Sequence, residues 1–552
     1  MTQKRILIVG GVAGGASCAA RSRRLCEDAE IIIFDRGPFV SFANCGLPYY
    51  VGDVITDEKK LLVANTDLFK QRFNIEVRLL NEVLSIDREN RQITVKDLEK
   101  DKVYTESYDA LVLSPGASPI RPPLPGIDLP GIFALRTIPD SRRIRAWIQE
   151  HQVQQAVIVG GGFIGLEMTE NLVHRGISVT LLERLPQVMP PLDPEMVVPI
   201  YDRLKSHGVQ VNLGDGVTRF EAEGDRLQIT TESGQQYGAD LVILAIGVRP
   251  ETKLAQDAGL DLGDRGGFRV NEQMQTNDPH IWAVGDAVEV QDYVTGEWTL
   301  IPLAGPANRQ GRIAADAIAG RDMKFRGVQG TSVCGIFDLV VASTGASEKT
   351  LKRLNIPYEK IYLHPGHHVG YFPGAKPIDM KLLFSPDDGR ILGAQAAGSQ
   401  GVEKRIDVIA MALQRHATVF DLEEAELCYA PQFGAAKDPV NFAGAIAANH
   451  LRGDAPVVQW DAVDWERGFL LDVREKGEFE AGYVSGAINI PLGQLRDRLE
   501  ELPQDRDIYV YCQVGQRAYY ATRALRLNHY PAFNLTGGFK THNSVKNAEN
   551  TV

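Results

Sequence analysis

The sequence lacks the features that mark several classes of protein. Its 552 residues contain no apolar run near the roughly 20 residues that a membrane span needs. The formal net charge is −12, which argues against non-specific binding to nucleic acid or to anionic membranes. The N-terminus enters an apolar run at once, without a separate signal region, so we expect a cytoplasmic protein.

Cysteine is also scarce. The six cysteines form no CxxC pair, so neither a zinc site nor a CxxC redox motif is indicated, and we expect no metal. In a reducing cytosol they should be free thiols, of which one or two are catalytic. The hydrophobic content of 44% is ordinary for a globular protein. The length suggests about three or four domains.

A glycine-rich turn lies near the N-terminus. The apolar run Arg5–Val9 leads into GGVAGG at residues 10–15, and a helical segment follows. A second apolar run, Ile31–Phe34, ends at Asp35. Strand, glycine turn, helix, strand and acid in this order predict a dinucleotide-binding fold, in which the acid holds a ribose hydroxyl. The fingerprint is imperfect, because Val12 replaces its middle glycine.

The same pattern returns about 150 residues later. The run Ala156–Val159 precedes a full GxGxxG at residues 160–165, and the run Val179–Leu182 ends at Glu183. A carboxylate here would repel a 2′-phosphate, which favours NADH over NADPH. Arg184 beside it could soften that preference. Two copies of the pattern indicate two nucleotide-binding domains.

Three more apolar runs end in glycine turns. Ala110–Leu113 leads to Gly116, and Leu241–Ile246 leads to Gly247. The stretch TNDPHIWAVGD ends at Asp286, and we expect a helix to begin at Ala287. Asp286 could bond the ribityl chain of a second nucleotide, or it could simply cap that helix.

Cys45 lies in the stretch Val40–Tyr50, VSFANCGLPYY, about 30 residues after the first glycine turn. A thiolate near a nucleotide can attack a disulfide or persulfide sulfur, so the position suggests a redox site. The alternative is a packing cysteine that acts as a small hydrophobic residue.

These motifs together resemble the FAD-dependent pyridine nucleotide–disulfide oxidoreductases over residues 1–446. The resemblance implies an FAD domain at 1–149 and 247–326, an NADH or NADPH domain at 150–246, and a dimerisation domain at 327–446 that forms a homodimer. Its implied cofactor contacts are Gly10, Gly11, Ala13, Gly14, Asp35, Arg36, Gly116, Asp286, Ala287, Gly160, Gly162, Gly165, Glu183 and Gly247.

One branch of the family fits best. Tyr50 stands where two-cysteine members have their second cysteine, so SFANCG resembles the single-cysteine branch. Ala13 stands where the peroxidases and oxidases carry histidine. The stretches around Tyr371 and Tyr429 match coenzyme A disulfide reductases, which implies that both tyrosines reach Cys45 of the partner subunit. The implied coenzyme A contacts are Ser17, Arg21, Arg24, Ser41, Asn44 and Arg72, with Lys437 from the partner subunit.

The third domain reads as α+β. The apolar runs Val333–Ala342, Lys381–Phe384 and Ile391–Ala396 predict antiparallel strands. Helices are expected at about Val402–Arg415 and Asp421–Ala425. This domain offers enough apolar surface for a dimer interface.

The C-terminal region begins with a predicted linker at residues 447–460, where periodicity is lost. In the domain at 461–552, the strand Ile508–Tyr511 ends at Cys512, with Arg517 on the following loop. Backbone N–H groups and a cation there would lower the pKa of a thiol. LDVRE, GAINIP and CQVGQRA resemble a rhodanese domain of α/β type, which implies that Cys512 carries a persulfide sulfur.

The combination predicts an α/β enzyme that uses NADH and FAD to reduce coenzyme A persulfide or polysulfide, with the rhodanese domain handling sulfane sulfur. Coenzyme A disulfide reduction for thiol balance is the nearest alternative. Two other readings are a redox-sensing flavoprotein with a rhodanese docking module, and a sulfurtransferase with a structural flavin domain. The sequence leaves open the preferred sulfur substrate and the choice between NADH and NADPH.

Overall fold

The computed structural model describes residues 4–551 and divides them into two compact units. The first unit contains the chain up to Arg184 together with Gly208–Val328. The second contains Leu185–His207 together with the chain from Gln329 onward. The short segment 185–207, which directly follows the second predicted nucleotide acid, therefore packs with the C-terminal half.

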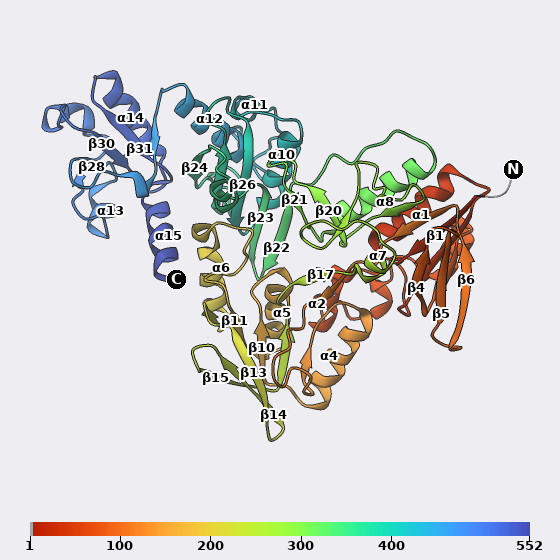
Figure 1. Cartoon of the computed structure of the whole chain (residues 1–552). Coiled ribbons are helices and arrows are strands. Elements are labelled where there is room, and N and C mark those ends of the chain that lie inside the picture. Colours follow the sequence, from red (N-terminus) through yellow and green to blue (C-terminus); the bar gives the residue numbers. More distant parts are fainter. Residues whose placement is uncertain (1–3, 552) are drawn as a thin grey trace. The chain divides into compact units, whose positions relative to one another are not determined.

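The first unit contains a parallel five-stranded sheet in the order β19-β7-β1-β2-β3. Helices α1 (Ala13–Leu25) and α8 (Ala304–Ile318) lie side by side against it (Figure 1). They approach closely because Gly311 has no side chain: a Cβ there would collide with the carbonyl oxygen of Gly14. The strands are β1 (Arg5–Val9), β2 (Glu30–Asp35), β3 (Glu76–Leu79), β7 (Ala110–Leu113) and β19 (Ile281–Ala283).

A second parallel sheet repeats this design in the order β12-β11-β10-β16-β9. In each sheet the strand before the glycine turn, β1 or β10, lies in the centre, and the turn lies between that strand and a helix, as a Rossmann fold requires. Helices α4 (Ile138–Glu150) and α5 (Phe163–His174) accompany this sheet. Its strands are β9 (Ile132–Phe133), β10 (Gln155–Val159), β11 (Ser178–Glu183), β12 (Gln210–Leu213) and β16 (Leu241–Leu244).

The prediction of a helix that begins at Ala287 is wrong. After Gly285 the chain enters β20 (Val288–Gln291), which pairs with β18 (Phe268–Arg269) and β21 (Trp298–Thr299). Val288, Glu289 and Val290 are all buried, so the strand is covered on both faces. The remaining elements are β4 (Asn81–Asp87), β5 (Gln92–Asp97), β6 (Lys102–Ser107), β8 (Ala117–Pro119), β13 (Val217–Glu223), β14 (Arg226–Thr231), β15 (Gln236–Ala239), β17 (Val248–Pro250), α2 (Leu47–Val51), α3 (Thr66–Phe73) and α7 (Lys253–Asp257).

The second unit has an antiparallel sheet in the order β22-β23-β26-β25-β24. The apolar run Val333–Ala342 is not one strand, because Phe337 takes a left-handed φ of 57° and turns the chain into a hairpin. The strands are β22 (Ser332–Ile336), β23 (Leu339–Gly345), β24 (Glu359–Leu363), β25 (Ile378–Phe384) and β26 (Ile391–Gly398). The helices are α6 (Pro194–Ser206), α9 (Glu348–Leu354), α10 (Val402–Gln414), α11 (Val419–Glu423) and α12 (Pro439–Leu451).

The predicted linker at residues 447–460 begins inside a helix and contains a strand. Helix α12 continues to Leu451, because Ala443, Ala447 and Ala448 form a buried face of good helix formers. The chain is irregular only briefly before β27 (Val457–Val458) joins the C-terminal sheet.

That parallel sheet has the order β27-β31-β30-β28-β29. Helix α15 (Gly538–Thr551) leaves it and packs against α6 within the same unit (Figure 1). The other elements are β28 (Phe469–Asp472), β29 (Ile488–Asn489), β30 (Ile508–Tyr511), β31 (Ala532–Leu535), α13 (Lys476–Glu480) and α14 (Gln516–Leu527).

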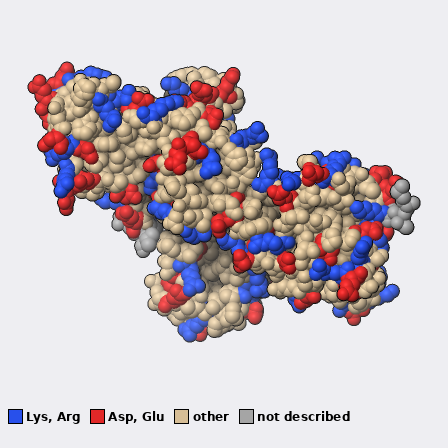
Figure 2. Space-filling view, turned by 45° about the horizontal axis from the view of Figure 1, so that its top comes forward, with Lys and Arg blue, Asp and Glu red and all other residues tan. Residues whose placement is uncertain are grey.

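The surface carries charges of both signs. On the face in Figure 2, basic and acidic side chains are interspersed over the tan background. Among the helices of the described chain, none combines the length and the apolar character that crossing a bilayer requires.

Candidate functional site

A cavity of about 440 Å³ opens beside the first glycine turn. Gly10 has a φ of +92°, and a Cβ there would collide with the carbonyl oxygen of Ser114. Only glycine therefore allows β1 and β7 to end so close together. The lining includes the predicted cofactor residues Gly10, Ala13, Gly14, Asp35, Arg36, Gly116 and Asp286.

The two nucleotide folds place their acids in the same way. Asp35 accepts hydrogen bonds from the N–H of Gly11 at 2.9 Å and of Gly37 at 2.8 Å. Burial raises the pKa of Asp35. Glu183 accepts from the N–H of Gly161 at 2.6 Å. Each acid is thus fixed against its own glycine turn, which suits a carboxylate that receives a ribose hydroxyl.

The glycines of the second turn divide into two kinds. Gly160 has a φ of +107°, and a Cβ on Gly165 would collide with the carbonyl oxygen of Gly160. Gly162, in contrast, faces open space, with nothing within 4 Å of a Cβ. Gly160 and Gly165 are required by the packing, whereas Gly162 leaves room for a ligand. Gly247 also has positive φ, at +105°.

Asp286 has a partner that the sequence did not reveal. Its carboxylate lies 3.0 Å from the guanidinium of Arg136, and both residues line the cavity. Arg136 directly precedes the capping box of α4, and that position was its only signal in the sequence. Ala287, predicted as a cofactor contact, is fully buried and its carbonyl accepts from the N–H of Phe268. Arg36 pairs with Glu251 at 3.3 Å.

Cys45 lies in a short 3₁₀ turn, Asn44–Gly46, directly before α2. Its side chain is exposed. Partial desolvation raises the pKa of the Cys45 thiol, and Glu167 and Asp286 raise it further, whereas Arg136 opposes them. Burial also raises the pKa of Glu167 to about 7. Packing of α2 on α5 brings Glu167 towards the thiol.

Three predicted coenzyme A contacts lie on one face of α1. Two of them already have partners on α8: Ser17 bonds Asn308, and Arg21 pairs with Asp316 at 2.8 Å. Arg24 is exposed, and its Nε donates to the carbonyl of Ala20 at 3.0 Å.

The other predicted contacts lie on loops and on α3. Ser41 has a left-handed φ of 49°, and Asn44 lines the cavity. The side-chain oxygen of Asn44 is buried, and no hydrogen bond reaches it from the described residues. Arg72 on α3 is exposed, as is Lys437 in the second unit.

Tyr371 and Tyr429 meet in the second unit. Their hydroxyl oxygens lie 2.6 Å apart, and 74% of Tyr371 and 44% of Tyr429 remain exposed. The hydrogen bond with Tyr371 raises the pKa of Tyr429. The structure therefore joins the two predicted tyrosines into one exposed pair.

Cys512 follows β30, as predicted, and is fully buried. Its sulfur accepts a hydrogen bond from the N–H of Gly515 at 3.2 Å, and Gly515 has a φ of +93°. Glu478 bonds both terminal nitrogens of Arg517, at 2.6 and 2.7 Å. Glu478, and Cys512 with it, raise the pKa of Arg517. Sequence reasoning missed Glu478, which is distant along the chain.

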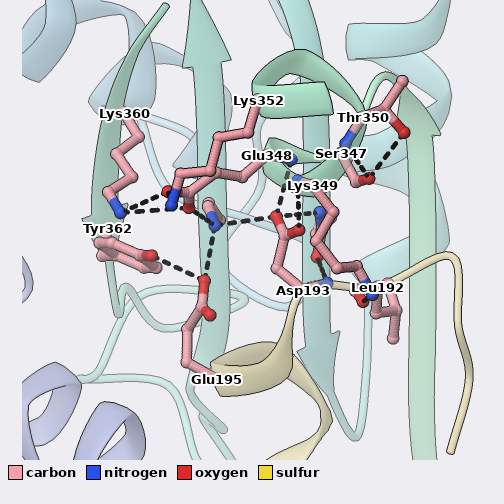
Figure 3. A network of polar contacts seen from close by, with 12 residues as sticks. Leu192, Asp193, Glu195, Ser347, Glu348, Lys349, Thr350, Lys352, Lys360 and Tyr362 are labelled. Carbon is pink, nitrogen blue, oxygen red and sulfur yellow. Dashed lines mark hydrogen bonds and ion pairs between the residues drawn. The ribbon is translucent and has the colours of Figure 1, made fainter. Parts of the chain in front are cut away.

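One group of carboxylates among the described residues is close enough together to hold a metal ion: Asp193, Glu195 and Glu348. Figure 3 shows these carboxylates within one network of polar contacts. Lys381 lies among them. Its Nζ lies 2.8, 2.6 and 2.6 Å from the three carboxylates, in that order. The ammonium group thus supplies the positive charge that a metal would bring. Burial lowers the pKa of Lys381, but its neighbours outweigh burial and raise it.

Comparison with known families matches three domains in succession. The pyridine nucleotide-disulphide oxidoreductase family matches residues 4–311, and the dimerisation domain of that family matches residues 331–438. A rhodanese-like domain matches residues 458–543.

Individual proteins are similar over most of their length. A coenzyme A disulfide reductase of Staphylococcus haemolyticus is 36% identical over 442 residues, which is 80% of this chain and 98% of the relative. The structure of reduced Bacillus anthracis CoADR-RHD is similar with a TM-score of 0.96 and 51% identity, covering 99% of this chain and 98% of that one. A NAD-dependent persulfide reductase from A. fulgidus has a TM-score of 0.90 and 33% identity, covering 97% and 99%.

Proposed function

Since this chain belongs to the pyridine nucleotide-disulphide oxidoreductase family, we propose that it uses NADH to reduce a persulfide or disulfide of coenzyme A at Cys45. The observation that carries this proposal is the exposed thiol of Cys45 next to a cavity built for a dinucleotide. The similar proteins named above, a coenzyme A disulfide reductase and a persulfide reductase, support the same class of substrate.

The cavity fits FAD. Its glycine turn, the fixed carboxylate of Asp35 and the Arg136–Asp286 pair offer backbone N–H groups, a ribose acceptor and polar contacts for such a group. The chemistry that bound FAD would supply there is transfer of the electron pair of NADH to sulfur. Glu183 supports NADH over NADPH, because a carboxylate repels a 2′-phosphate.

The thiolate of Cys45 attacks the sulfur that is bonded to coenzyme A. With a persulfide, this attack expels hydrosulfide; with a disulfide, it expels a coenzyme A thiolate. Both leave a disulfide between Cys45 and coenzyme A, and two electrons then restore the Cys45 thiolate and release the thiol. Because desolvation raises the pKa of Cys45, the thiolate needs a cation such as Arg136 nearby.

The homodimer supplies a proton donor. The family resemblance implies that the partner subunit's Tyr371 and the partner subunit's Tyr429 reach Cys45. A phenol positioned there can protonate the expelled thiolate or hydrosulfide. The exposure of both hydroxyl-bearing rings is compatible with that role.

The rhodanese domain handles sulfane sulfur before this step. Cys512 follows a strand, accepts an N–H bond at its sulfur and lies near Arg517, which suits a thiolate that carries an additional sulfur. Transfer of that sulfur to coenzyme A generates the persulfide that Cys45 reduces.

Steady-state oxidation of NADH tests this function. Wild type, Cys45→Ser, Cys512→Ser and the control Cys26→Ser are compared with coenzyme A persulfide and with coenzyme A disulfide. We expect Cys45→Ser to abolish turnover of both substrates, and Cys512→Ser and Cys26→Ser to retain it. Faster turnover of the persulfide than of the disulfide supports a role as a persulfide reductase. Faster turnover of the disulfide makes the protein a thiol-balance enzyme, and turnover that survives in Cys45→Ser contradicts the proposal.

A further inference from the structure

Residues 536–541, TGGFKT, lie between the Cys512 loop and the dimerisation domain, and we refer to them as the bridge segment. On one side they bond the loop: the N–H of Phe539 donates to the carbonyl of Cys512 at 2.8 Å, and that of Lys540 to the carbonyl of Gln513 at 3.0 Å. A Cβ on Gly538 would collide with the same Cys512 carbonyl. Two peptide units at the reactive cysteine are therefore fixed by the bridge segment.

On its other side the bridge segment bonds the dimerisation sheet. The hydroxyl of Thr536 accepts from the N–H of Tyr362 on β24 at 2.8 Å. The hydroxyl of Thr541 lies 2.8 Å from Nε2 of His364, and the ammonium group of Lys540 bonds Asp379 on β25.

These contacts support one another. Nδ1 of His364 lies 2.7 Å from the same Asp379 carboxylate that Lys540 bonds, so the carboxylate orients both partners. Burial raises the pKa of Asp379, but His364 and Lys540 outweigh burial and lower it. Thr536 and Thr541 are only 3% and 2% exposed, so water does not compete for their bonds.

Further contacts fix the bridge segment and the domain. Within the rhodanese-like domain, Nε1 of Trp460 donates to the carbonyl of Thr536 at 3.2 Å. Between the two domains, Nε2 of Gln459 donates to the carbonyl of Lys360 at 2.7 Å. Helix α15 begins within the bridge segment, at Gly538, and packs on α6. The rhodanese domain is thus docked through several independent contacts, and the chain that docks it is the chain that holds the Cys512 loop.

We propose that the bridge segment positions the Cys512 loop on the dimerisation domain, which makes His364 and Asp379 positioning residues for sulfur transfer at Cys512. The sulfur transfer itself rests on the proposed function. The reductase half of the chain then contributes to the geometry of the rhodanese site without touching its sulfur. A rhodanese domain that needed only a covalent connection to the reductase would not require buried, charge-paired contacts behind its reactive loop.

The test uses matched variants of the full-length protein with its flavin. Thr541→Val removes the hydroxyl at nearly constant shape, and Thr541→Ser keeps it. Lys540→Met removes the charge that meets Asp379, and Lys546→Met removes an exposed charge on the same helix. In the assay, Cys512 takes the outer sulfur of thiosulfate, releasing sulfite, and gives it to cyanide as thiocyanate. The second readout is the rate at which iodoacetamide alkylates Cys512, followed by mass spectrometry of its peptide.

We expect Thr541→Val and Lys540→Met to lower kcat for thiocyanate formation about tenfold, with KM within about twofold, because small misplacements of reacting groups are costly. Both should also change the alkylation rate of Cys512. Thr541→Ser and Lys546→Met should stay close to wild type in both measurements. The rescue by serine separates the hydroxyl bond from mere packing.

Wild-type values of kcat and alkylation in both Thr541→Val and Lys540→Met would overturn the proposal. So would equal losses in Thr541→Val and Thr541→Ser, because packing would then explain the effect. If Thr541→Val does not fold, Lys540→Met decides alone. A wild-type protein that transfers no sulfur at Cys512 overturns the proposed function of that residue, whereas the alkylation rates still decide whether the bridge segment positions the loop.

Discussion

The hydroxyl oxygens of Tyr371 and Tyr429 lie 2.6 Å apart, although 58 residues separate them in the chain. One hydroxyl must donate to the other, so each phenol sets the orientation of its neighbour. The bond also raises the pKa of Tyr429. The pair is exposed rather than part of a core. Two tyrosines that share one hydrogen bond should behave as a single proton-donating group.

Replacing the tyrosines tests that behaviour. We expect Tyr371→Phe and Tyr429→Phe each to lower kcat with coenzyme A disulfide roughly tenfold to a hundredfold, because general acid catalysis contributes on that order. The double variant should lose little more than either single variant, since residues that act as a unit are not additive. Steady-state NADH oxidation measures both. Tyr483→Phe, an exposed ring in the rhodanese domain, is the control, and a multiplicative loss in the double variant would contradict a shared role.

Two glycines of the second nucleotide turn allow an effect on nucleotide binding to be separated from an effect on folding. Gly162→Ala adds a methyl group to open space, so we expect folding to be unchanged and the KM for NADH to rise about tenfold, because the backbone can no longer approach the pyrophosphate. Gly165→Ala collides with the carbonyl of Gly160 and should lower the free energy of unfolding by about 1–3 kcal/mol. Thermal unfolding and NADH kinetics distinguish the two variants. An unchanged KM in Gly162→Ala would show that the nucleotide lies elsewhere.

Lys381 is the buried centre of a charged cluster. Lys381→Met removes the ammonium group that pairs with Asp193, Glu195 and Glu348. We expect a loss of about 3–5 kcal/mol in the free energy of unfolding, because uncompensated buried charges are strongly destabilising. Lys352→Met is the control: its side chain is 62% exposed and pairs with Glu348, so its loss should be below about 1 kcal/mol. Chemical denaturation measures both. Similar losses in the two variants would contradict this reading of the cluster.

Acid should weaken the same cluster. Burial raises the pKa of Glu348, but Lys381 and its neighbours outweigh burial and hold that pKa well below its ordinary value. The contribution of Glu348 to stability is complete above the unfolded pKa of about 4.3 and is lost as the pH falls towards the folded pKa. Unfolding measured between about pH 5 and pH 3 should therefore depend less steeply on pH in Glu348→Gln. The exposed Glu426→Gln should leave the slope unchanged; equal slopes in wild type and Glu348→Gln would refute the expectation.

Much of the fold could be predicted because buried parallel strands are continuous apolar runs. Arg5–Val9 and Ala110–Leu113 were predicted with the bounds that the structure gives. Two of the predictions that failed had ambiguous signals. Asp286 looked like a helix cap, but the alternation after it belongs to β20. Residues 447–451 lack an amphipathic pattern, yet their alanines complete a buried helix face.

Parts of the site depend on contacts that no local pattern records. Arg136 meets Asp286 across 150 residues, and Glu478 meets Arg517 across 39. Lys381 collects carboxylates from α6 and α9, although nothing in its own sequence context distinguishes it from a surface lysine. Motifs predicted Cys45 and Cys512 as reactive residues, whereas the charged surroundings of these cysteines became visible only in three dimensions.

The two-sided bonding of the bridge segment makes the chemistry of Cys512 and the docking of its domain thermodynamically linked. A change in the position of the Cys512 and Gln513 carbonyls is felt by the bridge segment, because these carbonyls bond it. The same segment bonds Tyr362, His364 and Asp379 of the dimerisation domain. Coupling free energies are reciprocal: if docking favours the sulfur-loaded loop, loading favours docking by the same amount. The strength of the contact between the rhodanese and dimerisation domains should therefore differ between the thiol and the persulfide forms of Cys512.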